Sequence, residues 1–326
     1  MNFFRRLRVT AENKPGDTKP TAVPSSLESA QATISTAELV SKAPLPLRAD
    51  IQFGDGATRP LNEDVLLSFL TPRHMQFGQI TDTGIVRNNN QDSAFSFFAT
   101  NRSVDEHPDF GLFIIADGMG GHHDGEKASA ITVHTVAQKL LKNVYLPMLD
   151  KGSDNSASIN EALVGAIEAA NNQVNTTVPD SGTTVTGLIL IKDLAYIAHV
   201  GDSRLYVITK TGIERITRDH SIVQRLIELD QITPDEAAEH PQKHVLYRAV
   251  GQTEVIEVDT LTRRLPAHAR LLLCSDGLWG MVEESDLIEI VMAAAQPQDA
   301  CQKLVALANK RGGMDNITAI LIFMPD

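Results

Sequence analysis

The amino-acid sequence predicts an α+β fold in which antiparallel β-sheets carry α-helices on their outer faces. Apolar runs typical of strands follow one another closely: residues 185–191 and 195–200 are separated by three residues around Asp193. Such a short connection favours a hairpin and antiparallel pairing. Other segments, such as the one from Leu163 to Val174, place apolar residues three and four apart. Each of these helices therefore has one face to bury, and a sheet is the surface that can cover it.

The predicted elements alternate irregularly along the chain. Strands are expected over residues 75–81, 93–98, 112–116, 185–191, 195–200, 204–208, 255–261, 271–275 and 317–323, which are short runs of β-branched and large apolar residues. Helices are expected over residues 125–141, 160–174, 221–229, 234–239, 283–295 and 298–310, where the apolar period is close to 3.6. The many hairpin-like connections exclude a strict βαβ alternation.

By composition the chain divides into an N-terminal extension, residues 1–74, and a folded domain, residues 75–326. From residue 10 to about residue 42 the chain is mostly Thr, Pro, Ser, Ala and charged residues without an apolar period. Burial there cannot offset the entropy of ordering, so we predict that the extension is mostly disordered. Within it, the apolar run from Val65 to Leu70 could form one short helix, which could dock on the domain or engage a partner.

The formal charge of −12 argues against nucleic acid and anionic lipid as partners, because both repel an acidic surface. Cys274 and Cys301 are the two cysteines and lie in no metal-binding pattern, so a reducing cytoplasm fits best. The chain has no run of about 18 uncharged apolar residues that would predict a transmembrane segment. We therefore expect a cytoplasmic protein.

Four aspartates stand next to apolar strands. Asp117, Asp202 and Asp276 follow such runs, and Asp315 precedes one. Each site alone could be an ordinary turn, since Asp and Gly are common in turns. Four carboxylates gathered at sheet ends would repel one another unless cations or shared protons lay between them. All-oxygen ligands suit Mg²⁺ or Mn²⁺ rather than zinc, and Gly118 would let its carbonyl approach as a further ligand.

Seven motifs, in this order, resemble those of the metal-dependent protein phosphatase 2C family, most closely its bacterial branch. They are Gly84-Ile-Val-Arg87-Asn-Asn-Asn-Gln91-Asp92, Asp117-Gly-Met-Gly-Gly121, Ser181-Gly-Thr-Thr184, Gly201-Asp-Ser-Arg204, Arg218-Asp-His-Ser221, Ser275-Asp-Gly277 and Gly313-Met-Asp-Asn316. The resemblance implies a four-layer α-β-β-α sandwich, with the site in a cleft at one end. It also implies that the chain is a serine/threonine phosphatase for phosphoproteins, opposes a bacterial Ser/Thr kinase and acts as a monomer.

The resemblance also implies roles for individual residues. Asp117, Asp276 and Asp315 would hold two catalytic Mn²⁺ or Mg²⁺ ions, together with the Gly118 carbonyl. Asp92 would hold metal-bound water. A possible third ion would share Asp276 and take either Asp202 or Asp180 as its other ligand. Arg87, five residues before Asp92, would bind the phosphate, as the planar guanidinium fork suits two oxygens.

Three points stay open in the sequence. Animal members of this family carry a histidine where this chain has Met119, so the proton donor could be metal-bound water, His122 or His123. The segment 211–248 corresponds to the family's variable flap and could shape substrate access. The alternatives to a protein phosphatase are a silent scaffold, which would have lost a metal aspartate or Arg87, and a hydrolase of other phosphate esters such as a nuclease.

Overall fold

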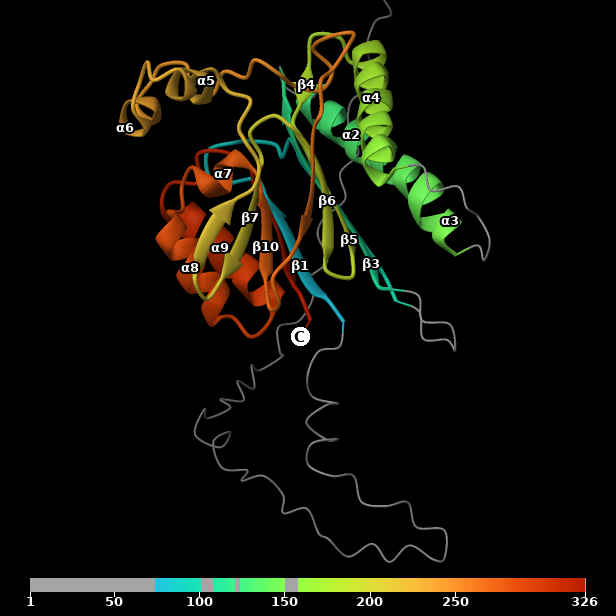
Figure 1. The fold of residues 1–326 in the computed structure, drawn as a ribbon. Helices are drawn as coiled ribbons and strands as arrows, with labels where there is room; N and C mark the ends of the chain where they lie inside the picture. The colour runs from blue at the N-terminus through green and yellow to red at the C-terminus, as the bar shows by residue number, and fades with distance from the viewer. Residues whose placement is uncertain (1–73, 101–107, 121–123, 150–157, 326) are drawn as a thin grey trace, which may run out of the picture. The chain divides into compact units, whose positions relative to one another are not determined.

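Two antiparallel β-sheets pack face to face with helices outside both, as the predicted α+β class requires (Figure 1). The computed structural model describes residues 74–100, 108–120, 124–149 and 158–325. The chain divides into two compact units, Met1–Pro60 and Leu61–Asp326, and every described residue lies in the second. The predicted disorder of residues 1–74 and the short helix over 65–70 therefore lie outside the described residues.

The first sheet, called sheet A, has the strand order β1-β11-β10-β7-β8. Its strands are β1 (Gln76–Asp82), β11 (Ile317–Phe323), β10 (Arg270–Cys274), β7 (Arg204–Thr209) and β8 (Gly212–Arg215). The second, sheet B, has the order β2-β3-β5-β6-β9, and a short strand, β4, pairs with β3. Its strands are β2 (Asp92–Ala99), β3 (Phe110–Met119), β4 (Gly182–Thr183), β5 (Val185–Ile191), β6 (Leu194–Val200) and β9 (Asp259–Arg264).

Helices cover the outer face of each sheet. Those over sheet B are α2 (Asp124–Leu140), which continues through one π-helical turn, η1 (Leu141–Tyr145), into α3 (Leu146–Met148), and α4 (Ile159–Thr177). Those over sheet A are α7 (Asp276–Trp279), α8 (Glu284–Ala293) and α9 (Pro297–Lys310). Two short helices, α5 (Ile222–Glu228) and α6 (Pro234–Ala238), lie in the segment between β8 and β9, away from the sheets (Figure 1). No described helix has the length and apolar character needed to cross a membrane.

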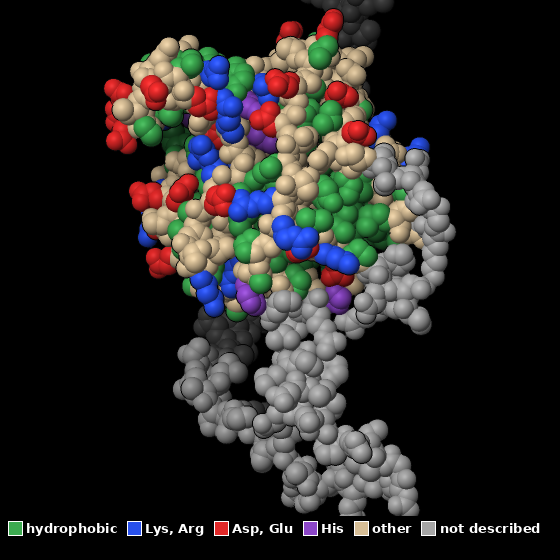
Figure 2. Space-filling model, in the orientation of Figure 1, with side chains coloured by type: hydrophobic (Ala, Val, Ile, Leu, Met, Phe, Trp, Pro, Cys, Tyr) green, Lys and Arg blue, Asp and Glu red, His purple; other side chains and the backbone are tan. Residues whose placement is uncertain are grey.

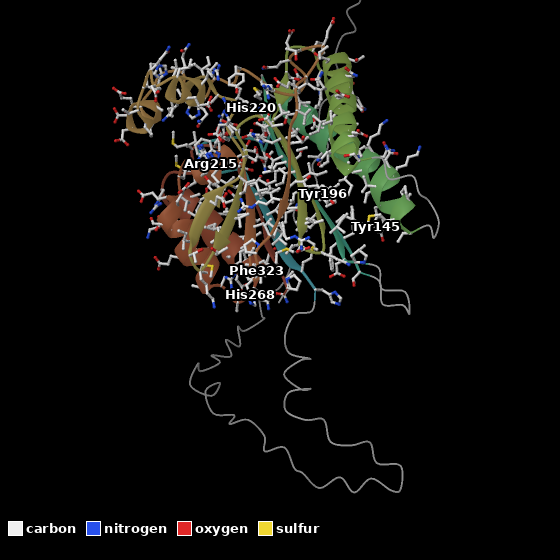
Figure 3. The ribbon with its side chains drawn as sticks, in the orientation of Figure 1. Tyr145, Tyr196, Arg215, His220, His268 and Phe323 are labelled. Carbon is white, nitrogen blue, oxygen red and sulfur yellow. The ribbon has the colours of Figure 1, made fainter. Side chains whose placement is uncertain are left out.

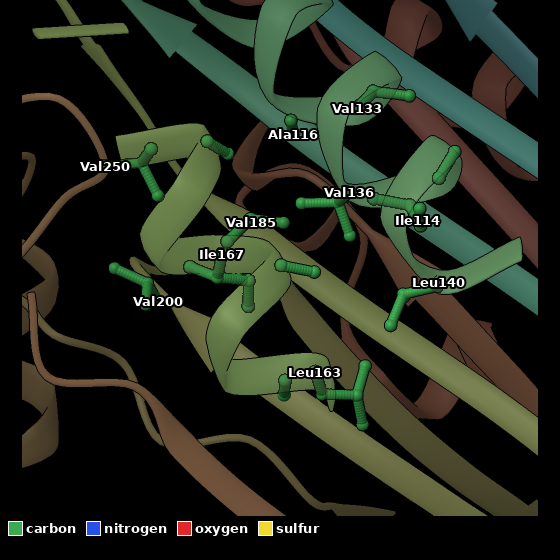
Figure 4. Packing of buried hydrophobic residues seen from close by; sticks show 14 of the residues in the cluster. Ile114, Ala116, Val133, Val136, Leu140, Leu163, Ile167, Val185, Val200 and Val250 are labelled. Carbon is green, nitrogen blue, oxygen red and sulfur yellow. The ribbon is translucent and has the colours of Figure 1, made fainter. Parts of the chain in front are cut away.

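Successive side chains along β3 point to opposite faces of sheet B and so belong to two different core layers. Ile114 points to α2 and α4, where it packs with Val136 and Ile167 (Figure 4). Phe113 and its alternating neighbours point the other way, into the layer shared with sheet A. A strand buried on both faces reads as a continuous apolar run, which is why 112–116 was recognisable from sequence.

One predicted strand is displaced. The run 255–261 was expected to be extended throughout, but β9 begins only at Asp259 and ends at Arg264. Residues 251–255 form a turn in which the Val255 side chain is 86% exposed. The strand is an edge with mostly exposed polar residues, so its position follows from pairing with β6 and not from an apolar pattern. The short strands β4 and β8 were not predicted.

The pairing of the strands places the ends of several of them, from both sheets, at the same end of the sandwich. Asp92 at the start of β2 is directly opposite Asp117 near the end of β3. In sheet A, Asp82 at the end of β1 is opposite Ile317 at the start of β11, while Cys274 closes β10. The residues just beyond these positions therefore come from both sheets and meet at one end of the sandwich.

Candidate functional site

The carboxylate of Asp92 joins the two sheets at this end. Its Oδ2 accepts hydrogen bonds from the Ser275 hydroxyl at 2.7 Å and from the Thr318 hydroxyl at 2.6 Å, and both donors belong to sheet A or its immediate continuation. Ser275 precedes Asp276, the first residue of α7. Ser275 belongs to one of the sequence motifs and Thr318 does not, but neither contact with Asp92 was predicted, because the two residues lie 183 and 226 residues from it.

The predicted aspartates share one electrostatic environment. Burial raises the pKa of Asp117 well above its usual range, and the negative charges of Asp92, Asp276, Asp202 and Asp315 raise it further. Burial and the charge of Asp276 likewise raise the pKa of Asp202. Like charges held this close in a partly dry site favour protonation or a bound cation.

Two buried carboxylate oxygens lack a hydrogen-bond partner among the described residues. Asp92 Oδ1 and Asp276 Oδ1 are buried, and neither has a hydrogen-bond partner in the described part of the chain. A buried carboxylate oxygen without a partner is costly, so each needs an ion or water. No three acidic, His or Cys side chains of the described residues converge on one point. Mg²⁺ commonly uses one or two carboxylates and keeps several waters, so this oxygen-only set fits such a hard ion.

The loop that carries Asp117 is fixed by backbone contacts. The Asp117 N–H donates to the Thr184 hydroxyl at 2.8 Å, and its carbonyl accepts from the Thr184 N–H at 2.8 Å. The next residue, Gly118, donates its N–H to the Gln91 carbonyl at 3.1 Å. A Cβ on Gly118 would lie 2.1 Å from the Gly125 carbonyl oxygen. The glycine therefore permits a close approach that no other residue could make.

Asp202 belongs to the cluster, whereas Asp180 is exposed in a turn with φ of 68°. The Asp202 carbonyl accepts a hydrogen bond from the Trp279 indole at 3.0 Å. The Arg204 guanidinium stacks 3.5 Å above the Trp279 ring and binds Asp219 through two nitrogens. These contacts fix the turn that presents Asp202.

Arg87 lies beside the acids, as its sequence position predicted. Its guanidinium donates to Asp315 Oδ2 at 2.6 Å, and 51% of the side chain is exposed. Asp315 raises the pKa of Arg87 by this hydrogen bond, so the group stays charged. One end of the guanidinium is held by Asp315 while the exposed remainder keeps donors available for a ligand.

A histidine that sequence reasoning missed contacts the cluster. His244, in the segment 211–248, has its Nδ1 3.8 Å from Asp276 Oδ2, and its side chain is 73% exposed. The contact with Asp276 raises the pKa of His244. The two residues are far apart in sequence and no motif surrounds His244, so only the fold could reveal the pair. His122 and His123, the loop histidines weighed as proton donors, lie outside the described residues.

His199 and His220 have structural roles. His199 is buried, shares a hydrogen bond with the Thr186 hydroxyl at 2.9 Å, and burial lowers its pKa to about 4. His220, which is labelled in Figure 3, accepts the Gly201 N–H at Nδ1 and pairs with Asp259 through Nε2. Both rings therefore stabilise the turn before Asp202.

The site predicts a pH dependence of stability. Burial chiefly, and then the charges of Asp276 and Asp315, raise the pKa of Asp92 to about 7, against about 4 in an unfolded chain. Between these values the folded state holds a proton that the unfolded state has lost, so stability present below about pH 4 is lost as the pH rises through about 7. In EDTA, we expect the unfolding temperature to fall between about pH 4 and pH 7. Asp92→Asn should flatten this fall, and calorimetry checks both; an unchanged slope in the variant would contradict the account.

Known proteins resemble this chain in sequence and in fold. The model of the family described as protein phosphatase 2C matches residues 88–310. The protein phosphatase PhpP of Streptococcus pneumoniae is 34% identical over 255 residues, covering 77% of this chain and 98% of PhpP. The structure of the S. agalactiae serine/threonine phosphatase superposes with a TM-score of 0.66 at 32% identity, covering 77% of this chain and all of that one.

A further solved structure is the catalytic domain of the serine/threonine protein phosphatase PstP, in complex with two manganese ions. It has a TM-score of 0.62 at 29% identity, and the match covers 78% of this chain and 99% of that one. The family match spans the strands and loops that supply Asp92, Asp117, Asp202 and Asp276, and Arg87 and Asp315 lie just outside its two ends. On this evidence, the chain belongs to the protein phosphatase 2C family.

Proposed function

We propose that this chain is a metal-dependent phosphatase that hydrolyses phosphoserine and phosphothreonine in proteins. The observation that carries the proposal is the cluster of buried carboxylates from both sheets, two of them with unpartnered oxygens, beside an exposed arginine. Anionic phosphate would be repelled by the acids alone, so a cation must lie between them. The names of the relatives, which are serine/threonine phosphatases, support the substrate class.

The metal roles follow from the donors available. We assign Asp117, Asp276, Asp315 and the Gly118 carbonyl to two Mn²⁺ or Mg²⁺ ions, and Asp92 to water in their shell. Asp202 is buried and the charge of Asp276 raises its pKa, whereas Asp180 is exposed, so Asp202 is the better candidate for a possible third ion. When bound, such ions make water nucleophilic near neutral pH and offset charge on the phosphoryl oxygens.

In this proposal Arg87 orients the phosphate, Asp92 orients water and His244 supplies a proton. Arg87, held by Asp315, directs its exposed N–H groups at the phosphate and stabilises charge on the equatorial oxygens. Asp92 stays fixed because Ser275 and Thr318 hold one of its oxygens, which leaves the other free to accept from water. His244 is the described histidine that contacts the cluster, and we assign it the proton for the leaving alkoxide.

Removal of the arginine tests the phosphate contact. We expect Arg87→Ala to lower kcat/KM by about 10- to 100-fold, because a hydrogen bond to a charged group is worth roughly 1.5–3 kcal/mol. Arg87→Lys should recover only part of this, since it keeps the charge and loses the fork. Steady-state kinetics on a phosphothreonine peptide measure both variants. Unchanged kinetics in Arg87→Ala would remove Arg87 from the phosphate site.

The proton donor is tested by comparing leaving groups. We expect His244→Gln to lower kcat roughly 100-fold on a phosphothreonine peptide, a typical contribution of general acid catalysis. On p-nitrophenyl phosphate the change should be small, because nitrophenolate leaves without a proton. Equal losses on both substrates would show that His244 positions Asp276 instead, and no loss on either would exclude it from catalysis.

The function is tested by incubating the full chain and Mn²⁺ with matched phosphoserine, phosphothreonine and phosphotyrosine peptides and, separately, with nucleic acid. Phosphate release from the first two is the expected result. Binding of phosphopeptides without release would favour a silent scaffold, and release from nucleic acid instead would favour the rival hydrolase. We further propose that the enzyme is a cytoplasmic monomer that opposes a Ser/Thr kinase, and that its catalytic domain begins near residue 75, after an extension that is mostly disordered.

A further inference from the structure

A cavity of about 770 Å³ opens at the end of sheet A that lies away from the carboxylates. Its walls come from the start of β1, the β7–β8 hairpin, the start of β10, the end of β11 and the residues after α8. At this end of sheet A, Phe323 pairs with Gln76 on one side and with Arg270 on the other. Arg270 in turn pairs with Ile208. The cavity and the phosphatase site lie at opposite ends of strands that are five to seven residues long, with a rise of about 3.3 Å per residue.

The cavity has a mixed lining of apolar and polar residues that includes three basic side chains, of which Arg270 donates to the Val291 and Ala294 carbonyls and stacks on Phe323. Val207, Ile213, Met292 and Phe323 supply apolar surface. Phe323 and His268 mark the place in Figure 3, and Figure 2 shows Lys and Arg side chains toward this lower end.

Charge favours an acidic occupant. The lining includes Lys210, Arg263 and Arg270 against one carboxylate, Glu214, which pairs with Arg263 at 2.6 Å. Two positive charges are therefore left over on a protein whose net charge is −12. An acidic segment with apolar side chains would match both the basic and the apolar side chains of the lining.

We propose that residues 61–70 of the same chain dock in this cavity. Their sequence, Leu61-Asn-Glu-Asp-Val-Leu-Leu-Ser-Phe-Leu70, carries two adjacent acids followed by five large apolar residues among the next six. The acids match the basic side chains of the lining, and the apolar residues match its apolar side chains. The first octet of the chain does not fit, because its three arginines would meet the same basic side chains.

Chain length permits this contact. Gln76 itself lines the cavity, the nearby His74 is held by Asp109 at 2.8 Å, and three residues separate His74 from Leu70, a reach of about 14 Å when extended. A short flexible tether gives an effective concentration in the millimolar range, so even weak intrinsic affinity yields substantial occupancy.

Disulfide trapping in the full chain tests the proposal. Cys274 and Cys301 are buried and burial raises both pKa values to about 12, so they contribute little background. Ser68→Cys combined with Ala295→Cys places one thiol in the segment and one on the cavity wall. Ser68→Cys with Asn172→Cys, an exposed position on α4 over the other sheet, is the matched control. Under copper–phenanthroline oxidation, we expect the cavity pair to form an intramolecular disulfide about tenfold faster.

Two further variants identify the contacts. Adding Phe69→Asp to the cavity pair removes an apolar contact, and adding Glu63→Lys with Asp64→Lys reverses the charge of the segment. Either change should reduce the rate of disulfide formation to that of the control pair. Equal rates for the cavity and control pairs would overturn the proposal. Disulfide-linked dimers from the cavity pair would also overturn it, by showing that a second copy occupies the cavity.

Discussion

Asp117→Asn and Asp276→Asn should each lower kcat on a phosphothreonine peptide by about 1000-fold, equivalent to the loss of roughly 4 kcal/mol of metal-dependent stabilisation. The amide keeps the shape of the carboxylate and removes the charge that holds the ion. Steady-state kinetics at saturating Mn²⁺ measure the loss. Asp193→Asn, the same change on an exposed hairpin that pairs with Arg264, should leave kcat unaltered.

The stability of the aspartate variants separates loss of chemistry from loss of fold. Burial and neighbouring charges raise the pKa of Asp117, so its ionised form destabilises the metal-free protein. Asp117→Asn should therefore unfold in EDTA at the same temperature as the wild type or higher, while being inactive. An inactive variant that unfolds much earlier would instead indicate a folding defect, and wild-type turnover would exclude the carboxylate from the metal site.

Gly118→Ala is the second change with a large expected effect. Its Cβ would lie 2.1 Å from the Gly125 carbonyl oxygen and 2.6 Å from that of Gln91, and both are backbone atoms. The loop must move to accommodate the methyl group, which should cost about 1–3 kcal/mol of stability. Displacement of Asp117 by about 1 Å should lower kcat about 100-fold.

The matched control for Gly118→Ala is Gly165→Ala, in α4, where a Cβ meets no atom within 4 Å. This variant should retain full activity and gain about 0.5–1 kcal/mol, since alanine is the better helix former. Thermal unfolding and kinetics on the two variants measure the contrast. Wild-type activity in Gly118→Ala would show that the close approach of this loop is not needed for the site.

The sequence predicted the elements whose pattern is set by burial. The strand 185–191 has the predicted bounds because nearly all of its residues are buried. The edge strand β9 was misplaced because its exposed residues carry no apolar pattern, and β8, with two exposed residues of four, was missed for the same reason. Edge strands are determined by pairing, which sequence alone does not reveal.

The candidate site could be predicted where its residues sit next to recognisable strands. Asp117 and Asp276 stand at the ends of apolar runs, so their meeting at one end followed from antiparallel pairing. The Ser275 and Thr318 bonds to Asp92, and the approach of His244 to Asp276, join segments that have no shared pattern. The preference for Asp202 over Asp180 likewise rests on burial, which no spacing rule distinguishes.

The central claim is that the carboxylate cluster holds divalent cations without which no phosphate ester is cleaved. The most direct test is phosphate release from a phosphothreonine peptide by EDTA-treated full chain, measured as free Mn²⁺ is titrated back. We expect no turnover in EDTA, and recovery with Mn²⁺ that Asp276→Asn abolishes. Turnover that persists in EDTA, or recovery that Asp276→Asn leaves intact, would contradict this claim.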